Sequence, residues 1–381
     1  MTAFAELVAG RGVVLCCGTG GVGKTTTAAV ISLIAARQGR NAVVVTIDPA
    51  KRLADTLGLA ELGNTAREIP RERWDLDGDA APGGHLSALM LDTRATFDGL
   101  VRRYAQDGAQ ATRILENRFY RNIAGALSGT QEYMAMEKLH ELYDEGGYDL
   151  IVVDTPPSRH ALDFLDAPQR LTRLLDNRIF RLLMMPTRTY LRLAGAAVQR
   201  FLRTVGKVLG TEVLDDIVAF FRAFEGMEQG FRDRAARVDE LLAEPQTAFV
   251  LITSPRRDAV DEAEFFAAQL REANIPIDAL IVNRVEPDFG SSASVSSLED
   301  RAEALDAAPS DAAHRLAARF RNLADYVDLG QRERYDLADV GQRIGAGTIA
   351  YVPSLPHDVV DFSALDAVAR HLFGDPTHGG E

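Results

Sequence analysis

Cysteine is scarce in this 381-residue sequence, and the two cysteines present, Cys16 and Cys17, are adjacent. Two thiols are too few for a disulfide framework or for a zinc site built from cysteine. Side chains of neighbouring strand residues point to opposite faces of a sheet. We therefore expect both cysteines to be core residues rather than ligands.

Long apolar runs are also missing. No stretch reaches the roughly eighteen uncharged apolar residues that a membrane-spanning helix requires. The N-terminal sequence MTAFAELVAGRG lacks the basic start and apolar run of a secretory signal. The seven histidines are scattered without the spacing of metal ligands. These absences predict a soluble, cytoplasmic protein.

Positive charge is in short supply overall, since 42 Lys and Arg residues stand against 55 Asp and Glu residues, a net charge of −13. This balance opposes binding to the phosphate backbone of nucleic acid, so no nucleic-acid partner is expected. The segment 169–211 is the exception, because it contains nine Arg or Lys residues and one acid, Asp176. It therefore differs in charge from the rest of the chain.

Seven short, apolar, β-branched runs indicate strands that are buried on both faces. They are residues 13–17, 42–47, 86–91, 149–153, 247–253, 279–282 and 348–352. Stretches of helical period, such as 25–38 and 258–272, lie between most of them. This alternation predicts an α/β fold with a mostly parallel sheet flanked by helices.

Two intervals between strands, 92–148 and 154–246, are much longer than a crossover helix requires. Apolar residues recur at helical spacing in both, which predicts one inserted α-helical subdomain. The expected division is a nucleotide-binding core at 1–105, 148–165 and 245–381, with the subdomain at 106–147 and 166–244 and a Ser-rich loop near 290–297.

The sequence GTGGVGKT at 18–25 follows the first apolar run and precedes the first helical pattern. It fits the phosphate-binding pattern GxxxxGK[ST], in which backbone N–H groups turn toward phosphate oxygens at a helix N-terminus. Lys24 is expected to reach the β and γ phosphates, and Thr25 to place its hydroxyl on Mg²⁺. The predicted nucleotide-binding residues here are Gly18, Thr19, Gly20, Gly21, Val22, Gly23, Lys24, Thr25 and Thr26.

Two acids follow apolar strands, Asp48 in TIDPA and Asp154 in VVDTPPSRH. Ligands of open α/β sheets bind at the carboxyl ends of the strands. Asp48 could orient attacking water and Asp154 could hold Mg²⁺, or each could cap the next helix. Two further acids, Glu132 and Glu137, would line the approach to the site or face solvent.

A family resemblance rests on five motifs, which are GTGGVGKTT, TIDPA, VVDTPPSRHALDFL, IVNRV and YVPSLPHDV. Their order and spacing resemble those of the ArsA-like ATPases, relatives of arsenite-pump ATPase subunits and tail-anchored-protein targeting factors. The family belongs to the deviant Walker A group of P-loop proteins, which also holds the MinD and ParA ATPases. The resemblance covers nearly the whole nucleotide-binding core, whereas the helical subdomain resembles the family mainly in position and length.

The resemblance implies binding and hydrolysis of ATP with Mg²⁺. It implies that Asp48 polarises the attacking water and that Asp154 is the Mg²⁺ acid of the second switch. Asn283 resembles the residue that reads the adenine edge, although Asn after a strand also commonly serves turns. Pro353 resembles the proline that packs on the base.

Thr19 departs from the family, which normally has a lysine there that reaches the partner's phosphates across a dimer. A cation supplied to the γ-phosphate contributes about 10³–10⁵ in rate in related phosphoryl transfers. Arg159 could replace it, or the partner could be a lysine-bearing paralogue, or hydrolysis could be slow and the nucleotide act as a switch. The predicted catalytic residues are accordingly Asp48, Lys24 and Arg159.

Further departures from the family narrow the prediction. The sequence has no CxxC pair of the kind with which eukaryotic members hold zinc between subunits, so no zinc is expected. It has no cysteine cluster for arsenite either, since soft metalloids take thiolate ligands. It contains one P-loop, so an assembly with two sites requires a homodimer or a heterodimer.

The basic segment 169–211 interleaves arginines with apolar residues at helical spacing, including Met184 and Met185. Such a surface fits a groove for a hydrophobic client helix, an anionic membrane surface, or ordinary packing on the core. We expect an ATPase in which Mg-ATP controls dimer closure and a client- or partner-binding helical subdomain. The alternative is a MinD/ParA-like nucleotide switch recruited to a membrane or a partner scaffold.

Overall fold

The computed structural model describes residues 2–47, 52–123, 130–144, 147–157, 211–287 and 294–374, and five single positions between 167 and 176. Asp48 and Arg159 therefore lie outside the described residues. So do Met184, Met185 and nearly all of the basic segment 169–211.

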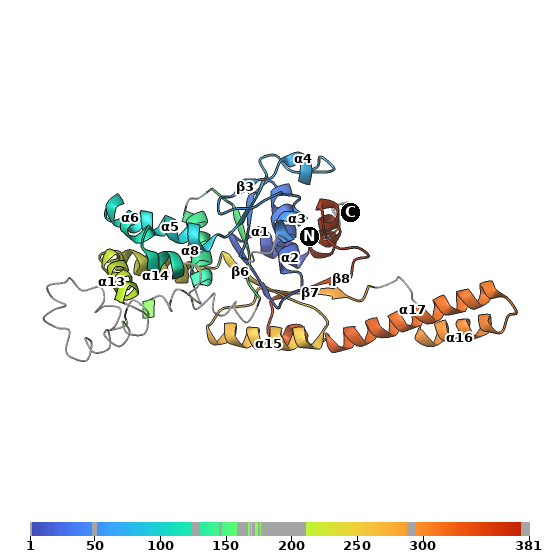
Figure 1. Ribbon diagram of the computed structural model, residues 1–381. Helices are drawn as coiled ribbons and strands as arrows, with labels where there is room; N and C mark the ends of the chain where they lie inside the picture. The colour runs from blue at the N-terminus through green and yellow to red at the C-terminus, as the bar shows by residue number, and fades with distance from the viewer. Residues whose placement is uncertain are drawn as a thin grey trace.

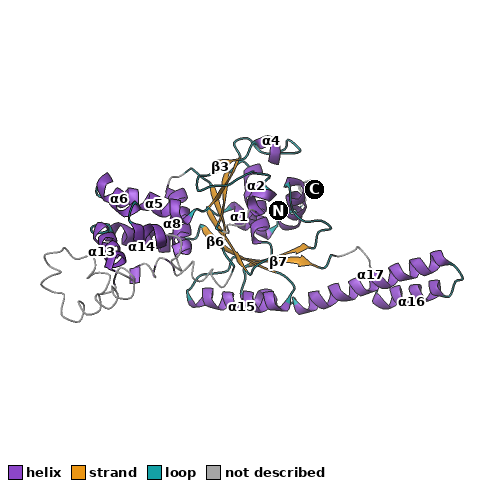
Figure 2. Ribbon diagram, viewed as in Figure 1, coloured by secondary structure: helices purple, strands orange, loops and turns teal. Residues whose placement is uncertain are grey.

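An eight-stranded sheet runs through the centre of the molecule (Figures 1 and 2). Its strands are β1 (Val13–Gly18), β2 (Asn41–Thr46), β3 (Arg67–Glu68), β4 (His85–Met90), β5 (Leu150–Asp154), β6 (Thr247–Thr253), β7 (Ala279–Val285) and β8 (Thr348–Pro353). The order across the sheet is β3-β4-β2-β5-β1-β6-β7-β8, and all pairs are parallel except β3 with β4. All seven predicted strands are present and the α/β fold class is confirmed. The sequence missed β3, because two residues are too short to show a pattern.

Helices cover both faces of the sheet. One face is covered by α1 (Ala3–Ala9), α2 (Lys24–Arg37), α3 (Arg52–Thr56), α4 (Arg71–Trp74) and α19 (Phe362–Phe373). The hydrophobic core on the other face includes residues of α5 (Thr93–Tyr104), α6 (Gly108–Leu115), α7 (Arg118–Ile123), α8 (Thr130–Asp144), α13 (Thr211–Ala223), α14 (Glu228–Ala243), α15 (Arg257–Glu272) and α18 (Val340–Ile344). Each face therefore has a hydrophobic core of its own.

The cysteine pair lies in β1 at the centre of the sheet, and its two side chains enter different cores. Cys17 belongs to the core that contains Leu15, and Cys16 to the core that contains Val14. Burial raises the pKa of Cys17 to about 12 and raises the pKa of Cys16 well above its usual value. Both side chains are thus buried neutral thiols, as the sequence predicted.

Helices from the two long intervals pack together in one lobe beside the sheet (Figure 1). The stacked rings of Tyr120 in α7 and Phe220 in α13 have centroids 6.0 Å apart. The buried Gln110 of α6 donates from Nε2 to the carbonyl oxygens of Ala223 (2.7 Å) and Glu225 (3.0 Å). These bonds satisfy carbonyls that the end of α13 leaves without helical partners.

A buried ion pair joins α8 to α14 in this lobe. Arg234 Nε donates to Glu137 Oε2 at 2.8 Å, and the two side chains are 4% and 1% exposed. The Tyr133 hydroxyl donates to the other oxygen of Glu137. The expectation that Glu137 lines the nucleotide site or faces solvent is therefore wrong, because its carboxylate is enclosed between two helices.

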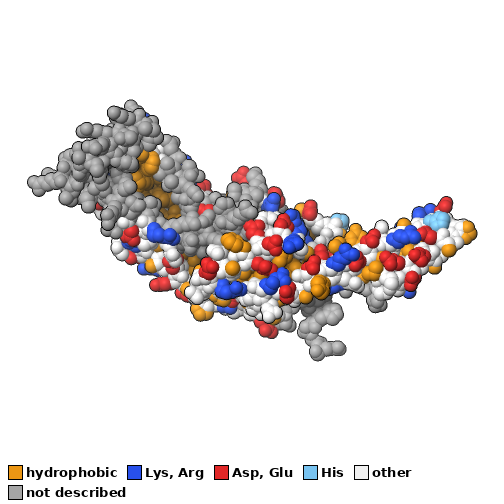
Figure 3. Space-filling view, turned by 90° about the horizontal axis from the view of Figure 1, so that it is seen from below, with side chains coloured by type: hydrophobic (Ala, Val, Ile, Leu, Met, Phe, Trp, Pro, Cys, Tyr) orange, Lys and Arg blue, Asp and Glu red, His pale blue; other side chains and the backbone are white. Residues whose placement is uncertain are grey.

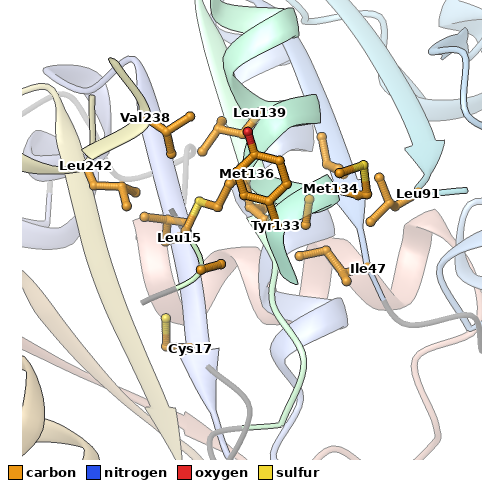
Figure 4. Close-up of a cluster of buried hydrophobic side chains, with 14 of the residues drawn as sticks. Leu15, Cys17, Ile47, Leu91, Tyr133, Met134, Met136, Leu139, Val238 and Leu242 are labelled. Carbon is orange, nitrogen blue, oxygen red and sulfur yellow. The ribbon is translucent and has the colours of Figure 1, made fainter. Parts of the chain in front are cut away.

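The same helix α8 packs on the sheet next to the phosphate-loop strand. Figure 4 shows Met136 and Tyr133 of α8 close to Leu15 of β1, and Cys17, further along β1, belongs to the same buried cluster. The helical lobe and the nucleotide-binding sheet thus share a continuous hydrophobic core.

The interval between β7 and β8 forms a helical hairpin, α16 (Val295–Asp306) and α17 (Asp311–Asp336), which projects from the sheet (Figure 1). Ser294 Oγ accepts from the backbone N–H of Ser297, so the last residues of the expected Ser-rich loop form the first turn of α16. Acidic and basic side chains are mixed along the hairpin (Figure 3). In the part of the chain that the structure describes, no helix is both long and apolar enough to span a membrane.

Candidate functional site

The loop between β1 and α2 has the backbone of a phosphate cradle. Gly18 has φ 152°, and a Cβ atom there would lie 2.2 Å from the carbonyl oxygen of Ile252 in β6. Gly23 has φ 100°, and a Cβ atom there would lie 2.3 Å from Asn283 Nδ2. Only glycine combines these conformations with such close contacts.

The N-terminus of α2 faces the cleft that this loop borders. Gly23 is its N-cap, and within the described chain no side chain caps the helix. The N–H groups of the first turn are thus left to a ligand, and the helix dipole favours an anion there. This arrangement suits a phosphate group.

Lys24 and Thr19 are joined within the loop. Lys24 Nζ donates to the backbone carbonyl of Thr19 at 2.8 Å, which holds the ammonium over the loop. The Thr19 side chain is only 6% exposed. The Thr19 side chain therefore packs against its own chain. The lysine that family members normally have at this position is expected to extend away from the loop toward a partner subunit.

Asp154, the last residue of β5, connects the end of β2 and the start of α2. Its Oδ2 accepts from Thr25 Oγ1 at 2.7 Å and from Thr46 Oγ1, at the end of β2, at 3.0 Å. The carboxylate is 1% exposed. A hydroxyl and a carboxylate are the hard oxygen donors that Mg²⁺ prefers, so Thr25 and Asp154 fit a Mg²⁺ site. No separate cluster of three or more His, Cys, Asp or Glu side chains suited to a metal occurs among the described residues.

Asn283, at the end of β7, is tied to the phosphate loop. Its Nδ2 donates to the Val22 carbonyl at 2.7 Å, and its Oδ1 accepts from the backbone N–H of Arg284 at 3.0 Å. A carbonyl oxygen has two lone pairs, so Oδ1 can accept a second bond, such as one from an adenine amino group. The contact to Val22 was not foreseen from the sequence.

These groups open onto one cleft of about 1120 Å³. The predicted residues that line it are Gly20, Gly21, Gly23, Lys24, Thr25, Thr26, Asp154, Asn283 and Pro353. Gly18, Thr19 and Val22 are buried and support the loop from behind. Sequence reasoning missed Arg52, Asp55, Arg284 and His357, which also line the cleft, because no spacing rule connects them to the loop.

The doubly covered parallel sheet, the glycine loop and the Thr25–Asp154 contact define a P-loop nucleoside triphosphatase. The family model for the anion-transporting ATPases, ArsA, matches residues 11–307. The chain belongs to this family and is an ATPase, which confirms the resemblance seen in the motifs.

Curated relatives agree with this assignment. The chain is 24% identical over 272 residues to ATPase GET3 of Malassezia globosa, covering 71% of this chain and 72% of that protein. It is 26% identical over 343 residues to ATPase GET3B of Arabidopsis thaliana, covering 86% and 77%. It is 25% identical over 284 residues to putative arsenical pump-driving ATPase 1 of Aquifex aeolicus, covering 72% of this chain and 64% of that protein.

Proposed function

We propose that this ATPase binds Mg-ATP in the cleft, closes a dimer around it, and uses closure to control a client- or partner-binding surface on the helical lobe. The observation that carries the proposal is the hydrogen bond between Thr25 and Asp154, 129 residues apart in sequence. It supports the proposal because a phosphate-loop hydroxyl and a strand-end carboxylate lie side by side, and both are oxygen donors that suit Mg²⁺.

We assign roles to the following residues at the cleft. Lys24 leaves the Thr19 carbonyl to bind the β and γ phosphates, while the α2 N-terminus receives phosphate oxygens. Thr25 and Asp154 hold Mg²⁺, which would neutralise charge on the phosphates. Asp48, outside the described residues, orients the attacking water. Asn283 and Pro353 bind the adenine.

The missing loop lysine requires a cation from elsewhere. Thr19 is buried and uncharged, so the loop of this chain supplies Lys24 alone. Either Arg159, outside the described residues, or a lysine of a paralogous partner then stabilises the transition state. The first case predicts a competent homodimer and the second a heterodimer.

The shared core supports coupling between nucleotide and helical lobe. Helix α8 packs on β5, whose last residue is Asp154, and shares a buried cluster with Leu15 and Cys17 of β1, which leads into the phosphate loop. A shift of the loop strand on nucleotide binding therefore changes the packing of α8. Arsenical transport, the activity in the name of the A. aeolicus relative, is left out of the proposal because both thiols of this chain are buried.

Turnover of Mg-ATP by the purified chain over a range of protein concentrations tests the proposal, with Asp48→Asn as the inactive control. Turnover per subunit that rises with concentration supports a homodimer, and its loss in Arg159→Ala assigns the cation. ATP binding without turnover at any concentration supports the heterodimer. Failure to bind ATP would contradict the proposal.

Hydrogen exchange over residues 165–240 tests the coupling, with ADP and a slowly hydrolysed ATP analogue compared. Different protection in the two states supports nucleotide control of this region. Identical protection would contradict it. Co-sedimentation with anionic vesicles tests the membrane alternative for the basic segment 169–211. ATP-dependent binding favours the membrane-recruited switch, and its absence leaves a protein client or ordinary packing on the core.

A further inference from the structure

Strand β7 contains a bulge at Arg284. Asn283 and Val285 pair with Val352 and Pro353 of β8, which leaves Arg284 as an extra residue between them. Arg284 has φ 62°, in the left-handed region that side chains other than Gly, Asn and Asp rarely adopt. Bulges next to sites commonly re-aim a side chain in this way.

Local hydrogen bonds fix this conformation. The backbone N–H of Arg284 donates to Asn283 Oδ1 at 3.0 Å, and Ser354 Oγ donates to the Arg284 carbonyl at 3.4 Å. The N–H of Ser354 in turn donates to the Val285 carbonyl at 2.9 Å. Backbone strain that the surroundings hold in place is concentrated at ligand sites.

The cleft has polar lining residues at the phosphate loop and an apolar wall contributed mainly by β8 and the residues after it. Lys24, Thr25 and Asp154 line the end at the phosphate loop. The chain from β8 onward also lines the cleft, with apolar Val352, Pro353, Leu355, Val359 and Val360 and with polar Ser354, His357 and Asp358 among them. A nucleoside triphosphate has the same asymmetry, so its phosphates fit the loop and its base fits the apolar wall. Arg284 lies beside this wall, next in sequence to Asn283.

The guanidinium of Arg284 is available for a ligand. The side chain lines the cleft and is exposed, and across the described ranges no hydrogen bond or ion pair engages its guanidinium. A planar arginine head stacks well on an aromatic face and carries a charge that the π system attracts. The other arginine among the described lining residues is Arg52, which begins α3, whereas Arg284 adjoins Asn283 and pairs within the β7–β8 edge.

We infer that Arg284 contacts the nucleobase, with its guanidinium stacked on one face of the adenine and the Pro353–Leu355 wall on the other. The strained backbone at the bulge is retained because it presents this side chain to the base. The inference rests on the proposed function, since it requires ATP as the ligand.

Calorimetric titration of the full chain with ATP and with inorganic tripolyphosphate, both with Mg²⁺, tests the inference. Tripolyphosphate has the phosphate chain without the base. Arg284→Ala is expected to weaken ATP binding about threefold to thirtyfold, the range of a stacked cation. Its affinity for tripolyphosphate stays at the wild-type value. Arg284→Lys keeps the charge but not the planar head, and its ATP affinity falls close to that of the alanine variant.

Two glycine variants separate the side chain from the backbone. Arg284→Gly relieves the left-handed strain, so Tm is unchanged or higher while ATP binding is still weakened. Asn274→Gly is the matched control, because Asn274 also has a positive φ, 58°, but does not line the cleft. Its ATP affinity is expected to equal that of the wild type.

Two results would overturn the inference. Equal losses for ATP and tripolyphosphate would place the guanidinium on the phosphates. Unchanged ATP binding in Arg284→Ala would show that the Arg284 side chain stays in solvent and does not contact the nucleotide. A wild-type chain that binds no ATP would instead defeat the proposed function itself, so the two failures are distinguishable.

Discussion

The nucleotide cleft and the helical lobe are built in different ways. The cleft is organised by backbone: glycine conformations, a helix N-terminus and strand ends place its polar groups. The lobe is organised by side chains, namely stacked aromatic rings and a buried ion pair between helices. Substitutions in the cleft should therefore affect ATP more than stability, and those in the lobe should do the reverse.

The largest expected effect is the loss of turnover in Lys24→Met. Removing the cation that binds the β and γ phosphates lowers kcat by about 10³-fold or more. Lys138→Met is the matched control, because this lysine is similarly buried but pairs with Glu141 within α8. Steady-state ATP hydrolysis compares the two variants. Comparable losses of kcat would contradict the different roles assigned to cleft and lobe.

Arg234→Met should lower the free energy of unfolding by about 3–5 kcal/mol, because it leaves the Glu137 carboxylate buried without its cation. Burial already raises the pKa of Glu137, although Tyr133 and Arg234 oppose the shift. Urea unfolding measures the loss, and ATP affinity of the folded protein should not change. The double variant Arg234→Met with Glu137→Leu should lose less than Arg234→Met alone; additive losses would contradict a paired charge.

Asn283→Ala should weaken ATP binding about tenfold, because it releases the Val22 carbonyl and loosens the phosphate loop. Asn117→Ala removes a similar bond in the lobe, where Asn117 Nδ2 donates to the Asp216 carbonyl at 2.9 Å. It should lower stability and leave the ATP affinity intact. Fluorescent-nucleotide titration and urea unfolding of both variants provide the comparison, which fails if the two behave alike.

The smallest expected effect is a pH dependence in the lobe. Burial and the neighbouring Arg234 lower the pKa of His140, although Asp144 opposes this shift. The unfolded chain therefore binds a proton below about pH 6.5 that the folded chain resists, so stability falls as the pH drops. His140→Gln should remove the contribution of His140 to the pH dependence of the free energy of unfolding, which is at most about 1.4 kcal/mol per pH unit. Urea unfolding of wild type and variant at pH 7.5 and 5.5 measures this contribution. An identical pH dependence in the two proteins would show that His140 does not contribute.

Sequence patterns predicted the cleft better than the lobe. The phosphate loop is eight consecutive residues whose conformation depends mainly on its own glycines, so its sequence carries the signal. Glu137 shows the opposite case: its helical pattern was readable, but its partner Arg234 lies 97 residues away on another helix. Arg284 was overlooked for a similar reason, since its bulge exists only in the pairing of β7 with β8.

The sequence by itself determined seven of the eight strands, the phosphate loop and the acid at the end of β5, because apolar strand runs and glycine conformations are local properties. The tertiary structure decided that Thr25 meets Asp154, that Asn283 holds the Val22 carbonyl 261 residues away, and that the Thr19 side chain is buried. Such contacts depend on the order of strands across the sheet. That order is set by how the whole chain buries its apolar surface, which no single segment encodes.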